Sequence, residues 1–190
     1  MKTRKLILTA AIAVLAVIYA IQLALTNHSP VKTFNLKDGI DSITIETNGQ
    51  TVSLSLEGGL WYVATENKSQ KSAGDDKKIE ELASAIKSIK SLSTVSRSNA
   101  QSELERYGFA DLTTINVTAA KNGKTVRTLK IGKNANGSAN SFIQLDNSSE
   151  TLLAGGSLRS VFDVSAEDLL QKTDAKETET AQTEIQENTN

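Results

Sequence analysis

Two Asn-Gly dipeptides, each between runs of alternating apolar and polar residues, constrain this chain to contain antiparallel sheet. Asn-Gly is typical of a two-residue hairpin turn, because both positions require positive φ angles. Around Asn48-Gly49, isoleucine occupies positions 43 and 45, and Val52, Leu54 and Leu56 follow the turn. A two-residue loop places all of them on one face of the hairpin. The register that we expect has the pairs Thr47–Gln50, Ile45–Val52 and Ile43–Leu54.

The second dipeptide, Asn122-Gly123, separates a strand around Ile115 from a strand expected over 125–131. A two-residue loop here would place Val117 opposite Thr128 and mix apolar with polar residues on each face. A three-residue loop, 121–123, sets Ile115 opposite Leu129 and keeps one face apolar. We therefore expect the longer loop, with Gly123 in the left-handed conformation.

Helices are expected between the two hairpins. After a strand over 60–65 and a polar loop over 66–74, carboxylates at Asp75 and Asp76 favour a helix start. Ser98 and Gln101 have the spacing of a capping box for a second, short helix that ends at Gly108. The apolar stripe of the first helix is Ile79, Leu82, Ala83, Ile86 and Ile89. Further strands are expected over 141–145 and 151–153, and short helices over 157–162 and 165–171, the last with a Ser165–Asp168 capping box.

The order of these elements predicts an α+β fold with antiparallel sheet, because strands and helices come in separate blocks. The sheet would be built from two hairpin-containing halves, with the amphipathic helix and the short second helix between them.

The N-terminus combines a basic start with a long uncharged segment. Lys2, Arg4 and Lys5 precede 20 residues, 6–25, without any charge. A helix of that length spans about 30 Å, the thickness of the hydrocarbon core of a membrane. The positive-inside rule keeps the basic end in the cytoplasm. We expect residues 1–25 to be a transmembrane anchor, with a cleaved signal sequence as the alternative.

Three further regions follow the anchor. Residues 26–38 are expected to be a membrane-proximal linker, and 39–172 a single extracytoplasmic α+β domain. The last segment, 173–190, is rich in Thr and Glu and has one aliphatic residue, Ile185. Such a composition cannot bury enough surface to offset the entropy of ordering, so an acidic disordered tail is expected.

Composition excludes several classes of function. The chain has no Cys, one His and a net charge of −1. Disulfide scaffolds, zinc–thiolate sites and cysteine nucleophiles are thereby excluded. A near-neutral chain also lacks the electrostatic footprint of a nucleic-acid-binding protein.

Candidate catalytic motifs are weak. Ser84 and Lys87 have the Ser-x-x-Lys spacing of some acyl-transfer enzymes, but the same spacing recurs at Ser29 and Lys32 and the accompanying motifs are missing. Acid pairs near Asp75 have a structural explanation at the helix start. We expect no catalytic residue, cofactor or metal ligand.

Aromatic residues are few, and four of them have a position worth testing: Trp61, Tyr62, Tyr107 and Phe109. They are either core anchors or a stacking surface for a sugar or peptide. They form the candidate binding surface that the sequence offers.

Several segments in a fixed order resemble a bacterial family. They are GGLWYV (58–63), the amphipathic helix, LERYGF (104–109), INVT (115–118) and LKIG (129–132). This set resembles the family called domain of unknown function 4340, over about residues 36–172. The resemblance implies one N-terminal anchoring helix and a domain that faces the periplasm or the cell exterior. For some members it implies an auxiliary role beside gliding-motility or related transport systems of the ABC class, with no catalytic residues.

The sequence thus predicts a membrane-anchored extracytoplasmic binding or accessory domain, acting as an auxiliary subunit of an ABC-type transport or envelope complex. It would sit in the bacterial cell membrane through residues 6–25, with its N-terminus in the cytoplasm, and bind a protein partner in the membrane or envelope. The alternatives are a sugar- or peptidoglycan-binding module, and an envelope hydrolase that uses Ser84 and Lys87.

Overall fold

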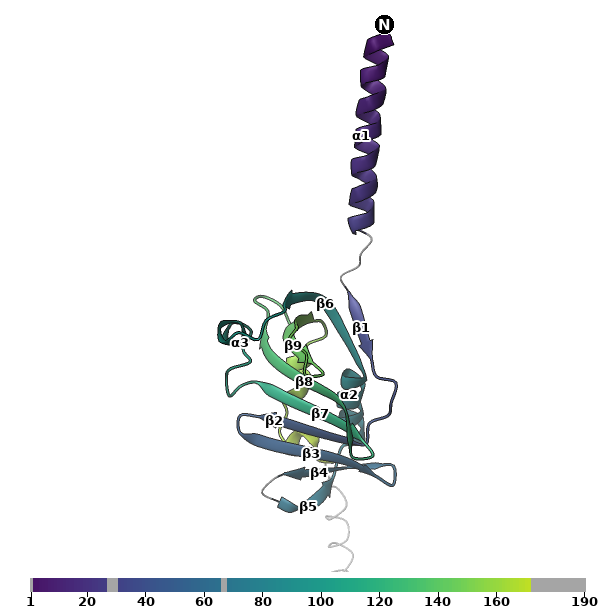
Figure 1. Ribbon diagram of the computed structural model, residues 1–190. Coiled ribbons are helices and arrows are strands. Elements are labelled where there is room, and N and C mark those ends of the chain that lie inside the picture. The colour runs from purple at the N-terminus through teal and green to yellow at the C-terminus, as the bar shows by residue number, and fades with distance from the viewer. Residues whose placement is uncertain (1, 27–30, 66–67, 172–190) are drawn as a thin grey trace, which may run out of the picture.

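The described chain forms one continuous antiparallel sheet that carries helices on one face (Figure 1). The computed structural model describes residues 2–26, 31–65 and 68–171, with side chains described for 10–22, 31–64 and 71–171. Ten strands of these residues join in the order β1-β6-β10-β9-β8-β7-β2-β3-β4-β5. Their bounds are β1 (Lys32–Asn35), β2 (Ser42–Thr47), β3 (Gln50–Glu57), β4 (Leu60–Thr65), β5 (Lys68–Ala73), β6 (Ser88–Ser96), β7 (Ile115–Lys121), β8 (Lys124–Asn134), β9 (Ser141–Leu145) and β10 (Thr151–Ala154).

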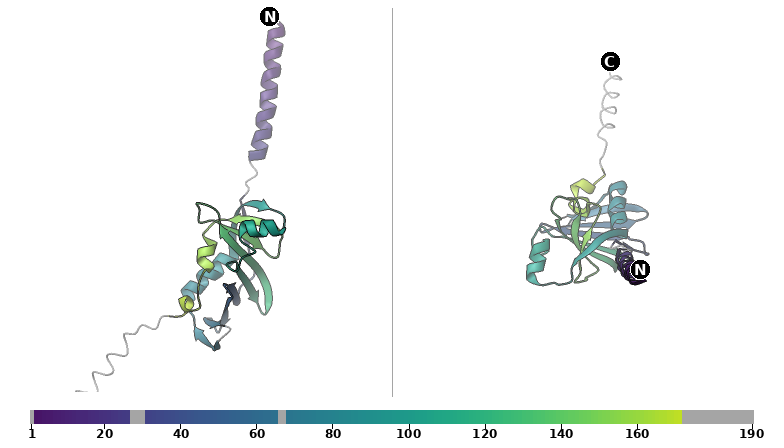
Figure 2. Two further views of the ribbon diagram at one scale, coloured as in Figure 1. Left: turned by 90° about the vertical axis from the view of Figure 1, so that its left-hand side faces the viewer. Right: turned by 90° about the horizontal axis from the view of Figure 1, so that it is seen from above.

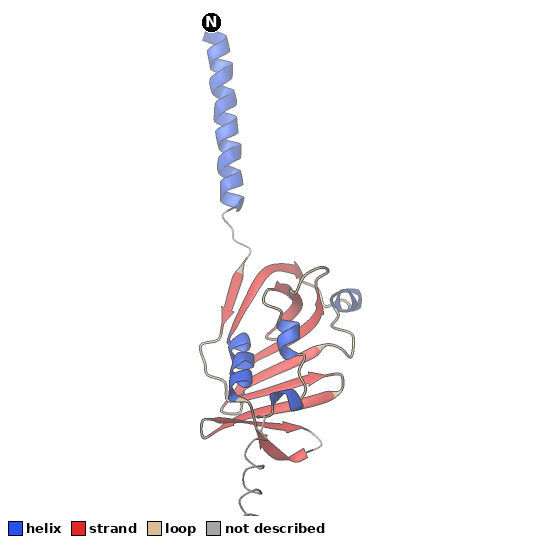
Figure 3. Ribbon diagram, turned by 180° about the vertical axis from the view of Figure 1, so that it is seen from behind, coloured by secondary structure: helices blue, strands red, loops and turns tan. Residues whose placement is uncertain are grey.

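The helices of the domain gather on one side of this sheet. Viewed from behind, α2 (Asp76–Lys87), α4 (Leu158–Phe162) and the 3₁₀-helix η1 (Glu167–Leu169) cover one face, and α3 (Gln101–Tyr107) lies at the rim (Figure 3). The core fills the space between these helices and the inward side chains of the strands. Its fully buried members include Ile43, Ile45, Ile79, Ile86 and Phe162. The α+β class is confirmed, whereas the division of the sheet into two halves stays a prediction.

The first hairpin has the predicted register. Thr47 pairs with Gln50, and the buried pairs Ile45–Val52 and Ile43–Leu54 follow. Asn48 and Gly49 have φ angles of 51° and 72°, as the two-residue turn requires. Turn chemistry and burial agree on a single register here, and this hairpin lies inside the sheet, between β7 and β4.

The second hairpin differs from the prediction, because a β-bulge replaces the three-residue loop. Lys121 pairs with Lys124 across the two-residue turn Asn122-Gly123. The register then shifts between Ala119 and Ala120, so that Val126 is the extra residue on β8. Beyond the bulge Val117 faces Leu129 and Ile115 faces Ile131, which restores an apolar face. The predicted Ile115–Leu129 pairing is wrong, although Gly123 does have a positive φ of 74°.

Two edge strands form in segments that the sequence predicts to be irregular. Lys32–Asn35, within the expected linker 26–38, is strand β1 and pairs with β6. Lys68–Ala73, within the expected polar loop 66–74, is strand β5 and pairs with β4. Both strands have one neighbouring strand and mostly polar sequences. Ladder hydrogen bonds hold them in the sheet, and in β1 Phe34 also packs against the core.

Strand β6 was not predicted, because its first apolar residue continues the helical spacing of α2. Ile89 is buried as expected, but it lies on β6 and not on the helix. The helix ends at Lys87, and Ser88 is extended, with φ −134° and ψ 99°. The chain therefore passes from helix to strand without a loop, and β6 crosses to the far side of the sheet beside β1 and β10.

Helix caps are partly as predicted. The Asp75 side chain accepts a hydrogen bond from the Lys78 backbone N–H at 3.3 Å and caps α2. Ser165 and Asp168 form the expected reciprocal capping box. The Ser98–Gln101 box is wrong, because α3 begins at Gln101 after Ala100 and has no side-chain cap. The remaining expectation for that helix, its end at Gly108 in the left-handed conformation, is confirmed.

A buried arginine ties the first strand to the core. Arg127 of β8 is 7% exposed, and its guanidinium donates hydrogen bonds to the carbonyl oxygens of Phe34 and Ile86 at 3.1 and 3.0 Å. Phe34 lies on β1, and Ile86 is in the last turn of α2. One cation therefore joins β1, the C-terminal end of α2 and the middle of the sheet. Asp146, with Oδ2 3.6 Å from Nε, balances the charge.

The N-terminal helix α1 (Lys2–Thr26) stands apart from the sheet (Figures 1 and 2). Every described side chain of α1, residues 10–22, is exposed. Among the described residues, no helix meets the length and apolarity needed to cross a membrane. The predicted tail, 173–190, lies outside the described residues.

Candidate functional site

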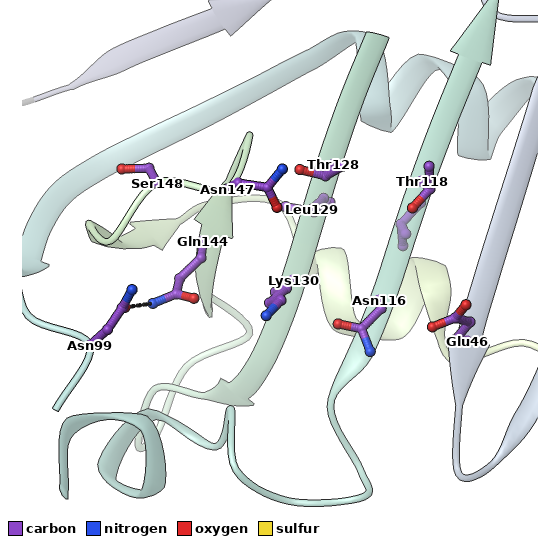
Figure 4. Close-up of a pocket in the computed structure, with 11 residues that line it drawn as sticks. Glu46, Asn99, Asn116, Thr118, Thr128, Leu129, Lys130, Gln144, Asn147 and Ser148 are labelled. Carbon is purple, nitrogen blue, oxygen red and sulfur yellow. Dashed lines mark hydrogen bonds between the residues drawn. The ribbon is translucent and has the colours of Figure 1, made fainter. Parts of the chain in front are cut away.

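The face of the sheet that the helices leave open carries polar side chains on neighbouring strands. Strict alternation produces this face: Asn116 and Thr118 lie between buried residues of β7, and Lys130 lies between two buried residues of β8. Glu46 occupies the corresponding outward position at the end of β2. Figure 4 shows these side chains on one side of three adjacent strands.

Two loops turn the middle of this face into a pocket of about 420 Å³. Asn99, from the segment between β6 and α3, forms one wall, and the Gln144 amide nitrogen of β9 donates a hydrogen bond to its Oδ1 at 2.8 Å (Figure 4). Asn147 and Ser148, in the turn between β9 and β10, form a second wall. In this turn Asp146 and Asn147 both have positive φ angles, of 51° and 58°.

A second pocket, of about 380 Å³, continues the first across β2. The two pockets share Glu46, Asn116 and Lys130. The second is closed by the turn of the first hairpin and by the loop that carries Phe109 and Leu112. We call the two together the sheet groove, and its main polar side chains are Glu46, Asn99, Asn116, Thr118, Lys130 and Gln144.

Several side chains of the sheet groove have no partner within the described chain. The side chains of Glu46, Asn116, Thr118 and Lys130 make no hydrogen bond or ion pair with any described residue. The hydroxyl of Thr128, which also lines the groove, is buried without a hydrogen-bond partner among the described residues. Polar groups in such a position have unused capacity to bind a ligand.

The four aromatic candidates do not form one surface. Trp61 is 5% exposed and points into the core from β4, and its backbone N–H donates to the Asp76 carboxylate at 2.9 Å. Tyr62, the next residue, has the opposite orientation and is half-buried. Trp61 and Tyr62 line neither pocket of the groove.

The other two aromatic candidates lie together near α3. Tyr107 is buried, packs edge-on against Phe142 with ring centroids 4.7 Å apart, and donates to the Val95 carbonyl at 3.4 Å. The ring of Phe109 lies over Gly132, where a Cβ atom would come within 3.0 Å of it. Of the four candidates, only Phe109 lines the sheet groove.

Comparison with protein-family models tests the family resemblance that the sequence motifs indicate. The model of the family described as "Domain of unknown function (DUF4340)" matches residues 61–189. The chain belongs to the DUF4340 family. The match begins at Trp61, later than the expected start at 36, and continues past the expected end at 172. No curated protein and no solved structure matches the chain.

The sheet groove falls mainly within the DUF4340 match. Asn99, Asn116, Lys130 and Gln144 lie inside residues 61–189, whereas Glu46 precedes them. The sequence alone does not single out these residues, because polar outward positions are ordinary in an antiparallel sheet with one solvated face. What distinguishes these residues is that Asn99 and Asn147 form walls beside them, and only the folded chain brings these two loops together.

The other predicted candidates of the DUF4340 domain lie away from the groove. Ser84 and Lys87 are both exposed on α2, on the opposite side of the sheet. Asp75 and Asp76 act as a helix cap and as an acceptor for the β4 backbone. Among the described residues, no group of three or more His, Cys, Asp or Glu side chains is close enough together to hold a metal ion.

One carboxylate of the domain has a perturbed acidity. Glu57, at the end of β3, accepts a hydrogen bond from the Lys71 ammonium of edge strand β5. This hydrogen bond, and then the charge of Lys71, hold the pKa of Glu57 below its usual value. Since both side chains are exposed and neither lines the groove, the pair fastens the edge of the sheet.

Proposed function

We propose that this protein is a membrane-anchored extracytoplasmic binding domain that serves as an accessory subunit of a transport or envelope complex. Residues 6–25 would lie in the membrane, and the sheet groove would be the binding surface. The observation that carries the anchor is the exposure of apolar side chains around α1: Ile12, Leu15, Ile18 and Tyr19 are between 46% and 65% exposed. A helix that is apolar all round is stable when lipid or protein covers it.

The orientation follows from charge. Lys2, Arg4 and Lys5 precede the uncharged segment, and basic residues stay on the cytoplasmic side. Strand β1 begins at Lys32, only six residues after Thr26, the last residue of α1. The domain would therefore lie close to the outer membrane–water boundary, in reach of a membrane protein partner.

Binding accounts for the groove better than catalysis does. Its side chains are chiefly amides and threonine hydroxyls, which hold ligands through hydrogen bonds. General acid–base or nucleophilic chemistry instead uses a titratable group hydrogen-bonded to the reacting one. Glu46, Asp111 and Lys130, the charged groups of the groove, form no ion pair with any described residue.

The absence of cysteine from the sequence permits a direct test of the topology. Single substitutions Thr3→Cys and Ser53→Cys place one thiol before the anchor and one on the exposed face of β3. In intact cells, a membrane-impermeant maleimide should label Ser53→Cys and label Thr3→Cys only after lysis. The full chain should also stay with the membrane after a carbonate wash.

Two results would contradict the proposal. Recovery of the chain in the soluble fraction, with a mature N-terminus near residue 21 or 25, would identify a cleaved signal sequence. Labelling of Thr3→Cys but not of Ser53→Cys in intact cells would reverse the orientation. A photoreactive residue at Lys130 should in addition crosslink to a specific membrane or envelope component in cells, whereas one at the exposed Ser84 of α2 should not.

A further inference from the structure

We infer that the ligand of the sheet groove is an uncharged, linear, hydroxyl-rich polymer, that is, an oligosaccharide chain. This inference rests on the proposed function, because it takes the groove to be the binding surface. It names the chemical class of the ligand from the shape, charge and hydrogen-bonding groups of the groove.

The shape favours an extended ligand. The two pockets share three lining residues, so they adjoin, and together they reach from Asn147, beside β9, to the hairpin turn beyond β2. It crosses β9, β8, β7 and β2, which are consecutive neighbours in the sheet. Three inter-strand spacings of about 4.8 Å give a length of about 14 Å, sufficient for a short oligosaccharide.

The hydrogen-bonding groups match sugar hydroxyls. Asn99, Asn116, Gln144 and Asn147 each carry an amide that both donates and accepts, and Thr118 adds a hydroxyl with the same dual capacity. A sugar hydroxyl also donates and accepts, so that each can be satisfied by one such group. The buried and unpartnered Thr128 hydroxyl lines the same groove and would gain its missing partner by rotating toward a ligand hydroxyl.

The charges of the groove disfavour polyelectrolytes. Glu46 and Lys130 are shared by the two pockets, and Asp111 lines the second, so the groove has two carboxylates and one ammonium group. A polyanion such as nucleic acid requires an excess of basic side chains, which the groove lacks, and a polycation requires an acidic excess larger than one carboxylate. A ligand without net charge suits this small balance best.

The pairing of the strands argues against an extended peptide. A peptide that binds to a sheet usually adds to an edge strand, where backbone N–H and C=O groups are free. The strands under the groove each have neighbours on both sides, and the edges of the sheet are β1 and β5. The strands under the groove therefore offer a ligand side chains and no free strand edge. Where the second pocket passes β8, Phe109, partly buried over Gly132, offers a ring for the C–H side of a sugar.

The test uses the full chain in detergent micelles and three neutral probes: chitotetraose, cellotetraose and maltotetraose. Binding is followed by NMR shifts of the groove amides at millimolar probe. At least one probe should bind, and Asn116→Ala should weaken it about tenfold, equivalent to about 1.4 kcal/mol. Ser53→Ala, an outward residue of β3 outside both pockets, is the matched control and should bind like the parent chain.

Folding is separated from binding by a second variant. Lys130→Ala removes another side chain that has no described partner, so both groove variants should keep the thermal stability of the parent while binding weakens. If none of the three probes shifts the groove resonances, or if shifts persist in both variants, the oligosaccharide inference is overturned. The crosslink at Lys130 then tests the wider proposal. A specific crosslink without sugar binding would support the groove as a binding surface for another ligand. If neither the crosslink nor sugar binding is seen, the groove is not a binding surface.

Discussion

Replacement of Gly132 by alanine should destabilise the domain strongly, because α3 ends directly above this glycine. A Cβ atom at position 132 would lie 2.1 Å from the carbonyl oxygen of Tyr107 and 3.0 Å from Cε1 of Phe109. Carbon and oxygen atoms in contact are normally more than 3 Å apart, so the Tyr107 backbone would have to retreat by about 1 Å. Backbone shifts of this kind lower the free energy of unfolding by about 1–3 kcal/mol. Because the packing under Phe109 is also disturbed, we expect a loss near the upper end of that range.

The matched control is Gly155→Ala. There the nearest atom to a new Cβ is Leu92 Cδ2 at 3.7 Å, an ordinary contact. A glycine-to-alanine change at a compatible position stabilises by about 0.4–1 kcal/mol, because it reduces the entropy of the unfolded chain. Urea unfolding of the full chain in detergent, followed by the fluorescence of the single buried Trp61, should separate the two variants by about 2–4 kcal/mol. Equal unfolding midpoints would refute the packing of α3 on Gly132.

Three further perturbations test other contacts. Arg127→Met removes both hydrogen bonds of the buried guanidinium and should lower the free energy of unfolding by about 2–4 kcal/mol. Hydrogen exchange should show that β1 loses protection first. A uniform loss of protection would contradict the role of Arg127 in holding β1. Asp75→Ala should cost about 0.5–2 kcal/mol by loss of the α2 cap, whereas Ser84→Ala on the same helix should leave the urea midpoint unchanged. The carboxyl of Glu57 should titrate by NMR below its usual value of 4.5 and return to it in Lys71→Met. Because the pKa of Glu57 is lower in the folded chain, the Glu57–Lys71 pair stabilises the fold above pH 4.5, and its contribution disappears as the pH falls through the folded pKa. An unchanged titration of Glu57 in Lys71→Met would exclude the pairing.

The parts of the fold that the sequence predicts correctly are those where two independent signals agree. At the first hairpin, Asn48-Gly49 fixes the turn and the burial of alternate residues fixes the same register. At the second, the two signals conflict by one residue. The protein resolves the conflict with a bulge at Val126 rather than with a longer loop. The one-residue conflict is visible in the sequence, but a bulge and a longer loop both remove it, so the pattern alone does not choose between them.

The strands that the sequence missed are held by long-range pairing. β1 and β5 are short, polar and at the edges, so no local pattern distinguishes them from loops. β6 follows α2 without a break, and Ile89 fits both the helical and the extended pattern. Tertiary contact decides between the two conformations in such a segment.

The candidate site depends even more on tertiary structure. The scarcity of aromatic residues correctly identifies Trp61 and Tyr107 as unusual, but both are core residues. The groove instead consists of common residue types, and Asn99 and Gln144 become neighbours only because α3 and β9 pack together. From the alternation of outward polar residues one can predict that an open polar face exists, but not where it is hollow.

The position of β1 has a mechanical consequence. This strand is the first part of the domain after α1, so any force between an anchored N-terminus and a ligand held on the sheet must pass through it. It runs antiparallel to β6, with Lys32 opposite Ser91 at the end nearest the helix. A pull from that end acts along the strand, so the hydrogen bonds to β6, and the one from Arg127 to Phe34, share the tension instead of opening one at a time. The four residues of β1 thereby form a shear clamp. In an anchored chain with a bound ligand, the tension at which the clamp yields would set how firmly the domain is held.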